Sequence, residues 1–260
     1  MDYKESSQLS AEDEYKHWWI KTRFQYINAV LKYANKSEIL RVLEIGCGTG
    51  QNLRFIRQNS ICASRCTQVV GLDPHMPRDF MNPEWMNSQD QFVKGLPSDE
   101  PANLRGKKFD IILAMDVLEH VKDEEEALTQ WRHLLKPNGF LLITVPAFQA
   151  LWSYHDELLG HYRRYTRKHL ENVLMKCDFS PLSTGYVFSW LLPVLWLFRG
   201  VMNINKKDRT DLKKTNPLLN EFLFLLGCLE ARCGGFPFFG TSVVGIFRKT
   251  VCEEHSPHRS

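Results

Sequence analysis

Three closely spaced glycines follow an apolar run early in the chain. The run 42–45 leads into Gly46, Gly48 and Gly50, and a helical pattern follows over 51–56. Glycine lacks a Cβ, so the backbone can turn tightly there and a ligand can approach it closely. A helix that begins at such a turn points its free amide groups at the same place. The pattern predicts a binding site for a nucleotide-like cofactor.

The glycine spacing argues against a dinucleotide. That fingerprint needs a glycine at the position of Gln51, whereas Glu44 stands two residues before Gly46. Acid-x-Gly-x-Gly-x-Gly resembles motif I of the class I S-adenosylmethionine-dependent methyltransferases, in which the loop holds the methionine part. The resemblance implies S-adenosyl-L-methionine as cofactor; the binding residues that it implies here are Glu44, Gly46, Cys47, Gly48 and Asn52. Taken alone, such a turn can equally be a structural loop.

The next two predicted strands end in further candidate cofactor-binding residues. The strand 68–73 ends in Asp73, whose carboxylate can accept both ribose hydroxyls, with Pro74 beside it. The alternative is a solvated acid in a turn. After the strand at 91–96, many family members have an acid for the adenine amine. This chain has Leu96 there, so only an apolar or backbone contact is expected.

The run 109–115 is typical of a buried parallel strand and delivers Asp-Val-Leu-Glu-His at its carboxyl end. The segment resembles the post-strand-four motif of methyltransferases that act on small molecules and quinone-like lipids. The resemblance implies that Asp116 and Val117 flank the methionine part and that His120 faces the acceptor as a catalytic candidate. A capping or packing histidine is the alternative for His120, and Glu119 is expected to be structural.

Strands and helices alternate along the chain. A helix at 123–135 and a strand at 140–146 follow, and later strands are expected near 181–188 and 241–249. The fold predicted is α/β: a doubly wound, Rossmann-like seven-stranded sheet with an antiparallel last strand and a helical insertion between strands six and seven. We expect a single domain, 1–260. Its parts are an N-terminal helical cover (12–36), a core sheet (40–188), an apolar helical insertion or lid (189–236) and the last strand (237–250).

Two further segments are expected to shape the acceptor side. The predicted helix 12–34 contains Trp18, Trp19 and Arg23; the tryptophans cover the cofactor mouth or simply dock the helix, and Arg23 meets the methionine carboxylate. The segment 147–166 resembles a methyltransferase subgroup with Trp-Ser-x-x-Asp and Gly-His-x-Arg-Arg-Tyr signatures. Its catalytic candidates are His155 and His161, and its substrate-binding candidates are Trp152, Tyr154, Arg163 and Arg164. A salt-bridged loop is the alternative for the arginines.

Composition bounds the partners. A net charge of +3 over 260 residues, without an aromatic-studded basic groove, does not favour nucleic acid. Seven cysteines without paired zinc spacing indicate a reducing, cytoplasmic setting, and no metal site is predicted. The polar N-terminus is not expected to be a signal peptide.

The insertion suggests an apolar partner. It has an apolar stretch at 187–198, a basic linker and a second apolar helix at 218–229, none of them long enough to span a bilayer. It is expected to cover the acceptor pocket and to rest on anionic membrane, or else to be a hairpin packed on the sheet.

The function predicted is transfer of a methyl group from S-adenosylmethionine to a small-molecule or lipid-like acceptor. Because an Asn-Pro-Pro-Tyr-like signature is absent after strand four, oxygen or carbon is favoured as the acceptor atom. A non-catalytic cofactor-binding scaffold and a protein methyltransferase stay as alternatives. The oligomeric state is not predicted.

Overall fold

A seven-stranded sheet forms the centre of the protein. The computed structural model describes residues 9–34, 39–76, 83–99, 101, 104–193 and 215–250. The strand order is β3-β2-β1-β4-β5-β7-β6; β7 runs antiparallel to both β5 and β6, and all other neighbouring pairs are parallel. The strands are β1 (Leu40–Ile45), β2 (Cys66–Asp73), β3 (Gln91–Lys94), β4 (Phe109–Met115), β5 (Leu135–Pro146), β6 (Phe179–Val187) and β7 (Ser242–Lys249). The predicted α/β fold with an antiparallel last strand is confirmed.

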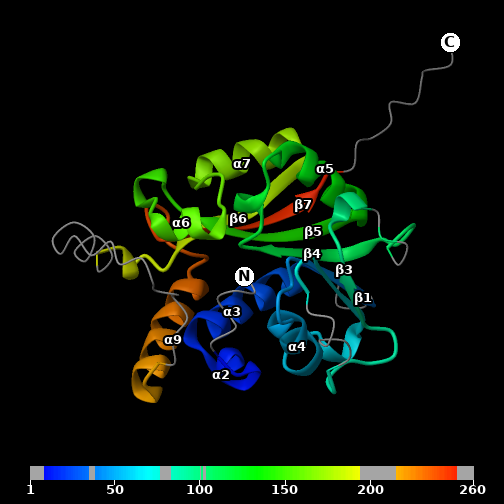
Figure 1. Cartoon of the computed structure of the whole chain (residues 1–260), viewed down its shortest axis with the longest axis horizontal. Coiled ribbons are helices and arrows are strands. Elements are labelled where there is room, and N and C mark those ends of the chain that lie inside the picture. The colour runs from blue at the N-terminus through cyan, green and yellow to red at the C-terminus, as the bar shows by residue number, and fades with distance from the viewer. Residues whose placement is uncertain are drawn as a thin grey trace, which may run out of the picture.

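Helices cover both faces of this sheet (Figure 1). The helices α5 (Glu124–Leu134) and α7 (Arg167–Lys176) pack on one face, and α3 (Trp18–Tyr33) and α4 (Gln51–Gln58) on the other. Side chains alternate along β4: Ile112 packs in the core on the α5 and α7 face, whereas Ile111 and Leu113 pack in the core on the α3 and α4 face. Because both faces are covered, all seven residues of β4 are buried, including Asp110 within its mainly apolar run.

Short elements complete the edges near the strand ends. They are α2 (Ala11–Lys16), η1 (Ala63–Arg65), η3 (Pro97–Asp99), η4 (Leu118–His120), η5 (Gln149–Leu151) and α6 (Tyr154–Leu159). The predicted N-terminal helix is in fact two helices, α2 and α3, because His17 adopts an extended conformation between them. Its ring nitrogen accepts a hydrogen bond from the Trp19 amide and so caps the start of α3.

The described part of the insertion packs on α3. Helix α9 (Pro217–Arg232) lies beside α3 and α2 and joins β6 to β7 (Figure 1). Its Glu230 accepts hydrogen bonds from the amides of Phe188 and Ser189, which anchors the end of α9 to the end of β6. The end of the first apolar stretch, from 194 onwards, lies outside the described residues, so the predicted lid stays a prediction. Within the described ranges, no helix is both long and apolar enough to cross a bilayer.

Candidate functional site

The glycine loop joins β1 to α4 at the carboxyl edge of the sheet. Gly46 and Gly50 have φ angles of +68° and +73°, a region that side chains other than glycine rarely adopt. A Cβ on Gly46 would lie 2.5 Å from Cγ2 of Val117, and one on Gly50 would lie 2.6 Å from Cζ of Phe92. Backbone conformation and close packing therefore both require glycine at these positions.

Asp73 is held against this loop. Its carboxylate accepts hydrogen bonds from the Gly48 amide at 2.9 Å and from the His75 amide at 2.8 Å. The side chain is buried at the end of β2, in the turn that contains Pro74. Each carboxylate oxygen keeps a second lone pair, so the predicted binding of ribose hydroxyls is compatible with these contacts. The structure thus brings Asp73 to the glycine loop, where its ribose role stays a prediction.

Glu44 and Asn52 present buried acceptors at the base of the loop. Oε1 of Glu44 accepts a hydrogen bond from Nδ2 of Asn52 at 2.6 Å. Oε2 of Glu44 and Oδ1 of Asn52 are buried, and neither has a hydrogen-bond partner among the described residues. Burial raises the pKa of Glu44 to about 7. Acceptors left without donors fit a ligand that carries N–H or O–H groups, such as S-adenosylmethionine.

Asp116 occupies the point where β4 leaves the sheet. It has a φ angle of +57°, accepts a hydrogen bond from the Thr144 hydroxyl at 2.8 Å and forms an ion pair with Arg23. The guanidinium of Arg23 thus lies on Asp116, and its contact with the methionine carboxylate stays a prediction. Val117 follows and packs over Gly46.

The paired tryptophans lie in an aromatic cluster on the α3 side. Trp18 is buried and makes an edge contact with Phe188 and a tilted contact with Trp190. Trp19 stacks on Phe188 with ring centroids 4.4 Å apart. These contacts favour docking of the helix over coverage of the cofactor.

One contact over the loop was not foreseen. Glu14 of α2 accepts hydrogen bonds from the Thr49 hydroxyl at 2.8 and 2.9 Å and from Gln51 at 3.3 Å, and its side chain is buried. These bonds place α2 over the start of α4. Nothing distinguishes Glu14 from its acidic neighbours in the sequence, so no local signal could have identified it.

Asp156 organises the loop after β5. It accepts two hydrogen bonds from the Arg164 guanidinium, at 2.7 and 3.0 Å, and lies 2.9 Å from Nδ1 of His161. Burial raises the pKa of Asp156, but the bonds from His161 and Arg164 outweigh burial and hold it well below its usual range. Asp156 also closes a capping box with Ser153 at the start of α6. The Ser-x-x-Asp spacing is the sequence signal that could have indicated this capping role.

Both arginines predicted to bind substrate have partners in the fold. Arg164 is held by Asp156, and Arg163 pairs with Glu124 at 3.0 Å and donates to the Lys122 carbonyl. These contacts favour the loop-stabilising alternative for both. The other predicted side chains are more open: Tyr154 is 43% exposed, Leu96 is 45% exposed, and Trp152 and His155 are half-buried.

The structure brings His120 and His161 together from two loops. Their rings are in T-shaped contact, with centroids 4.6 Å apart. The Tyr162 amide donates to the Glu119 carbonyl at 2.7 Å, which ties the loop after α6 to η4. Two predicted catalytic candidates therefore form one cluster, next to the loop that also carries Asp116.

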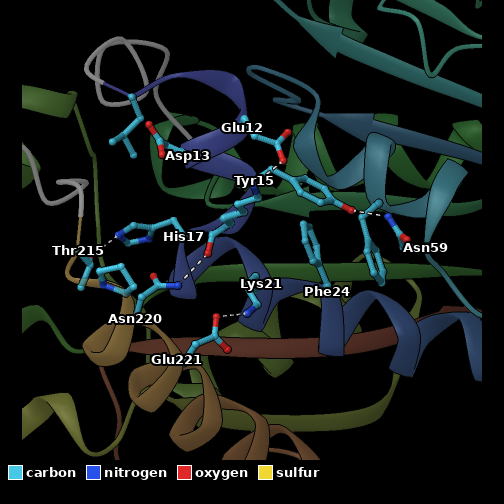
Figure 2. Close-up of a pocket in the computed structure, with 14 residues that line it drawn as sticks. Glu12, Asp13, Tyr15, His17, Lys21, Phe24, Asn59, Thr215, Asn220 and Glu221 are labelled. Atoms are coloured by element: carbon cyan, nitrogen blue, oxygen red, sulfur yellow. Dashed lines mark hydrogen bonds and ion pairs between the residues drawn. The ribbon is translucent and has the colours of Figure 1, made fainter.

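A separate hollow lies on the helical side of the molecule. It measures about 530 Å³ and lies between α2, α3, α4 and the start of α9 (Figure 2). Lys21, Phe24, Asn59 and Glu221 are among its lining residues, and Lys21 pairs with Glu221 at 2.7 Å. None of the predicted cofactor or acceptor residues lines it.

Several known proteins of similar sequence or structure are methyltransferases. A family model described as a methyltransferase domain matches residues 15–184, more than half of the chain. A ubiquinone biosynthesis O-methyltransferase of Cereibacter sphaeroides is 34% identical over 111 residues, which cover 40% of this chain and 40% of that protein. One of Histophilus somni is 32% identical over 124 residues, 47% of this chain and 50% of that protein. The chain thus matches half or less of the length of these relatives.

The fold also matches a solved structure. A SAM-dependent methyltransferase of Thermotoga maritima aligns with a TM-score of 0.50 at 18% identity, over 91% of this chain and 95% of that chain. This likeness supports the sheet topology described above. The length of the match to the family model decides the assignment: the chain belongs to the methyltransferase domain family, which confirms the S-adenosylmethionine-dependent class expected from its motifs.

Proposed function

We propose that this protein transfers a methyl group from S-adenosylmethionine to a hydroxyl oxygen of a small, apolar or lipid-like acceptor. The observation that carries the proposal is the convergence of two sites at one sheet edge. The glycine loop with Glu44 and Asp73 lies at the ends of β1 and β2, and Asp116 to His120 follow β4, the other neighbour of β1. The partial similarity to ubiquinone biosynthesis O-methyltransferases supports an oxygen acceptor.

The chain's own residues would do little covalent chemistry. When bound, S-adenosylmethionine supplies a methyl group already activated on sulfur. The glycine loop and Asp73 orient the cofactor, and Asp116, fixed by Thr144 and Arg23, shapes the space beside it. Because Nδ1 of His161 lies against the carboxylate of Asp156, Nε2 of His161 is left to accept the proton of an acceptor hydroxyl.

Calorimetric titration with S-adenosylmethionine tests the cofactor half of the proposal. Wild type should bind it, Asp73→Ala should weaken binding strongly, and Glu125→Ala, which removes an exposed acid on α5, should bind like wild type. No binding by wild type would contradict the proposal. Binding without turnover on hydroxylated small molecules, lipid extracts or proteins would favour the scaffold alternative, and turnover on proteins alone would move the acceptor to that class.

The exposed apolar face of α9 supports a membrane as the source of the acceptor. Leu218, Phe222, Leu225 and Leu229 repeat at helical spacing and are 85%, 57%, 59% and 58% exposed. The sequence just before α9 carries five basic residues between 206 and 214. An apolar helical stripe that follows a basic segment in the sequence suits a membrane surface with anionic lipids. We therefore propose that α9 rests on such a surface and gives the site access to lipid-like acceptors.

Flotation with phosphatidylserine vesicles tests this contact. Wild type should float at low salt and less at high salt, while the double variant Leu218→Glu/Phe222→Glu should not float. Leu158→Glu, an exposed apolar position on α6, is the matched control and should float like wild type. If wild type does not float, the proposed membrane contact is wrong. If wild type instead forms a concentration-dependent dimer that the double variant abolishes, the partner of α9 is a second copy of the chain.

A further inference from the structure

A carboxylate and two imidazoles converge where the loops after β4 and β5 meet. Glu119 and His120 belong to η4, and His161 follows α6. One ligand atom from each of the three residues lies within 4.8 Å of the other two. From this geometry we propose that Glu119, His120 and His161 bind a divalent transition-metal ion at the acceptor side of the site.

The carboxylate of Glu119 is the first independent reason. The residue is 1% exposed, and its Oε2 has no hydrogen-bond partner in the part of the chain that the structure describes. A buried carboxylate oxygen without a hydrogen-bond donor is costly, and buried charges in proteins are paired or coordinate metals. A metal ion bound to Glu119 would therefore provide the partner that its Oε2 lacks.

The orientation of His161 is the second reason. Its Nδ1 lies 2.9 Å from Asp156, a fully buried carboxylate that Arg164 holds with two hydrogen bonds. A histidine that binds a metal through one nitrogen commonly donates from the other to a carboxylate, which sets the tautomer and the ring direction. The bond from the Tyr162 amide to the Glu119 carbonyl fixes the two loops relative to each other. The ligands are thus held by the fold before any ion arrives.

The donor set selects the class of ion. Two imidazoles and one carboxylate suit Zn²⁺ and related first-row ions, whereas Mg²⁺ and Ca²⁺ prefer oxygen ligands. Metal–ligand bonds of about 2.1 Å allow two ligand atoms to lie at most about 4.2 Å apart. The three ligand atoms already lie within 4.8 Å of one another, so small rotations of the imidazole rings would complete the coordination. Three protein ligands leave at least one position open for another oxygen.

The open position connects the metal to the reaction, and this part rests on the proposed function. An acceptor hydroxyl bound to the ion would lose its proton to solvent more readily, because the cation stabilises the oxyanion. The oxyanion oxygen then forms the bond to the methyl carbon as the carbon–sulfur bond of the cofactor breaks. In this arrangement Nε2 of His161 holds the ion instead of taking the proton itself.

Zn²⁺ titration of the metal-stripped, untagged full chain tests the site without any turnover assay. Wild type should bind one equivalent by calorimetry. Asp156→Asn should weaken binding by about 10–100-fold, and His120→Gln or His161→Gln should weaken it further. His133→Gln, an exposed histidine on α5, is the matched control and should bind like wild type. Glu119→Gln preserves side-chain volume and should also lose affinity, which covers the case of a histidine variant that fails to fold.

Cobalt substitution provides a second readout. Co²⁺ in wild type should give visible d–d bands without a thiolate charge-transfer band, and His161→Gln should abolish them. No stoichiometric binding by wild type, equal loss in His133→Gln, or a thiolate band that places the ion at cysteines would overturn the proposal. S-adenosylmethionine binding measured on the same samples separates this failure from a failure of the proposed function.

Discussion

The guanidinium of Arg23 forms an ion pair with the carboxylate of Asp116 and so joins helix α3 to the loop after β4. The side chain of Arg23 is 6% exposed and that of Asp116 is 22% exposed, so solvent screens the pair weakly. Asp116 is also held by Thr144 of β5. The N-terminal helix therefore takes part in positioning a residue that follows a central strand.

Replacing Arg23 tests this link. Arg23→Met should lower the free energy of unfolding by about 3 kcal/mol, because it leaves a partly buried carboxylate without its partner. It should also weaken S-adenosylmethionine binding, since Asp116 would no longer be fixed. Lys21→Met is the control: it removes an ion pair whose Glu221 partner is 60% exposed, and should cost less than about 1 kcal/mol. Urea denaturation and calorimetry check both, and equal losses in the two variants would contradict the expected role.

The glycine loop allows strain and crowding to be separated. Gly46→Ala places a Cβ 2.5 Å from Val117 at a positive φ, whereas Gly160→Ala meets nothing within 4 Å at a φ of +72°. Gly160→Ala should therefore cost about 1–2 kcal/mol from backbone strain alone. Gly46→Ala should cost more and should abolish cofactor binding. Similar unfolding midpoints for the two variants would show that Val117 yields to the added methyl group.

Arg164 can be assigned by a conservative change. Arg164→Lys keeps the charge but loses the paired hydrogen bonds to Asp156, so unfolding should become easier by about 1–3 kcal/mol. Arg167→Lys alters a partly exposed pair with Glu171 at 3.7 Å and should change stability by less than about 1 kcal/mol. If Arg164→Lys keeps the wild-type stability but raises the acceptor KM, Arg164 contacts the substrate after all.

The buried carboxyl of Glu44 should make the stability of the cofactor-free protein pH-dependent. Its pKa rises from 4.5 in the unfolded chain to about 7 in the fold because of burial. The folded state therefore keeps a proton that the unfolded state releases, and this contribution to stability falls as pH rises from about 4.5 to about 7. Glu44→Gln should remove a slope of about 1 kcal/mol per pH unit.

The matched variant for this measurement is Glu12→Gln. Hydrogen bonds from Lys16 and Arg54 lower the pKa of Glu12 below 4.5, so this group is largely ionised in both states above about pH 5. It should contribute little to the slope, and with the opposite sign. Urea unfolding at pH 5, 6 and 7 gives the slopes. A Glu44→Gln protein with the wild-type slope would show that Glu44 is ionised in the fold.

Local patterns in the sequence predicted the fold and the residues that gather at the glycine loop. The apolar run of β4, the glycines at 46, 48 and 50, and the acid that ends β2 each act through residues near in sequence, so their spacing predicts their structure. The antiparallel β7 and the family follow from the same order of motifs. The helix break at His17 was missed because it depends on one ring capping the next helix.

Only the tertiary structure decided which side chains meet across the site. Arg23 pairs with Asp116, Glu14 accepts hydrogen bonds from the glycine loop, and Asp156 contacts both His161 and Arg164. Glu119, His120 and His161 form a cluster whose members come from two loops, so no sequence spacing could indicate it. The reason is physical: spacing reports which residues share one element, whereas contacts between loops depend on how the helices and strands pack and where each chain segment leaves the sheet.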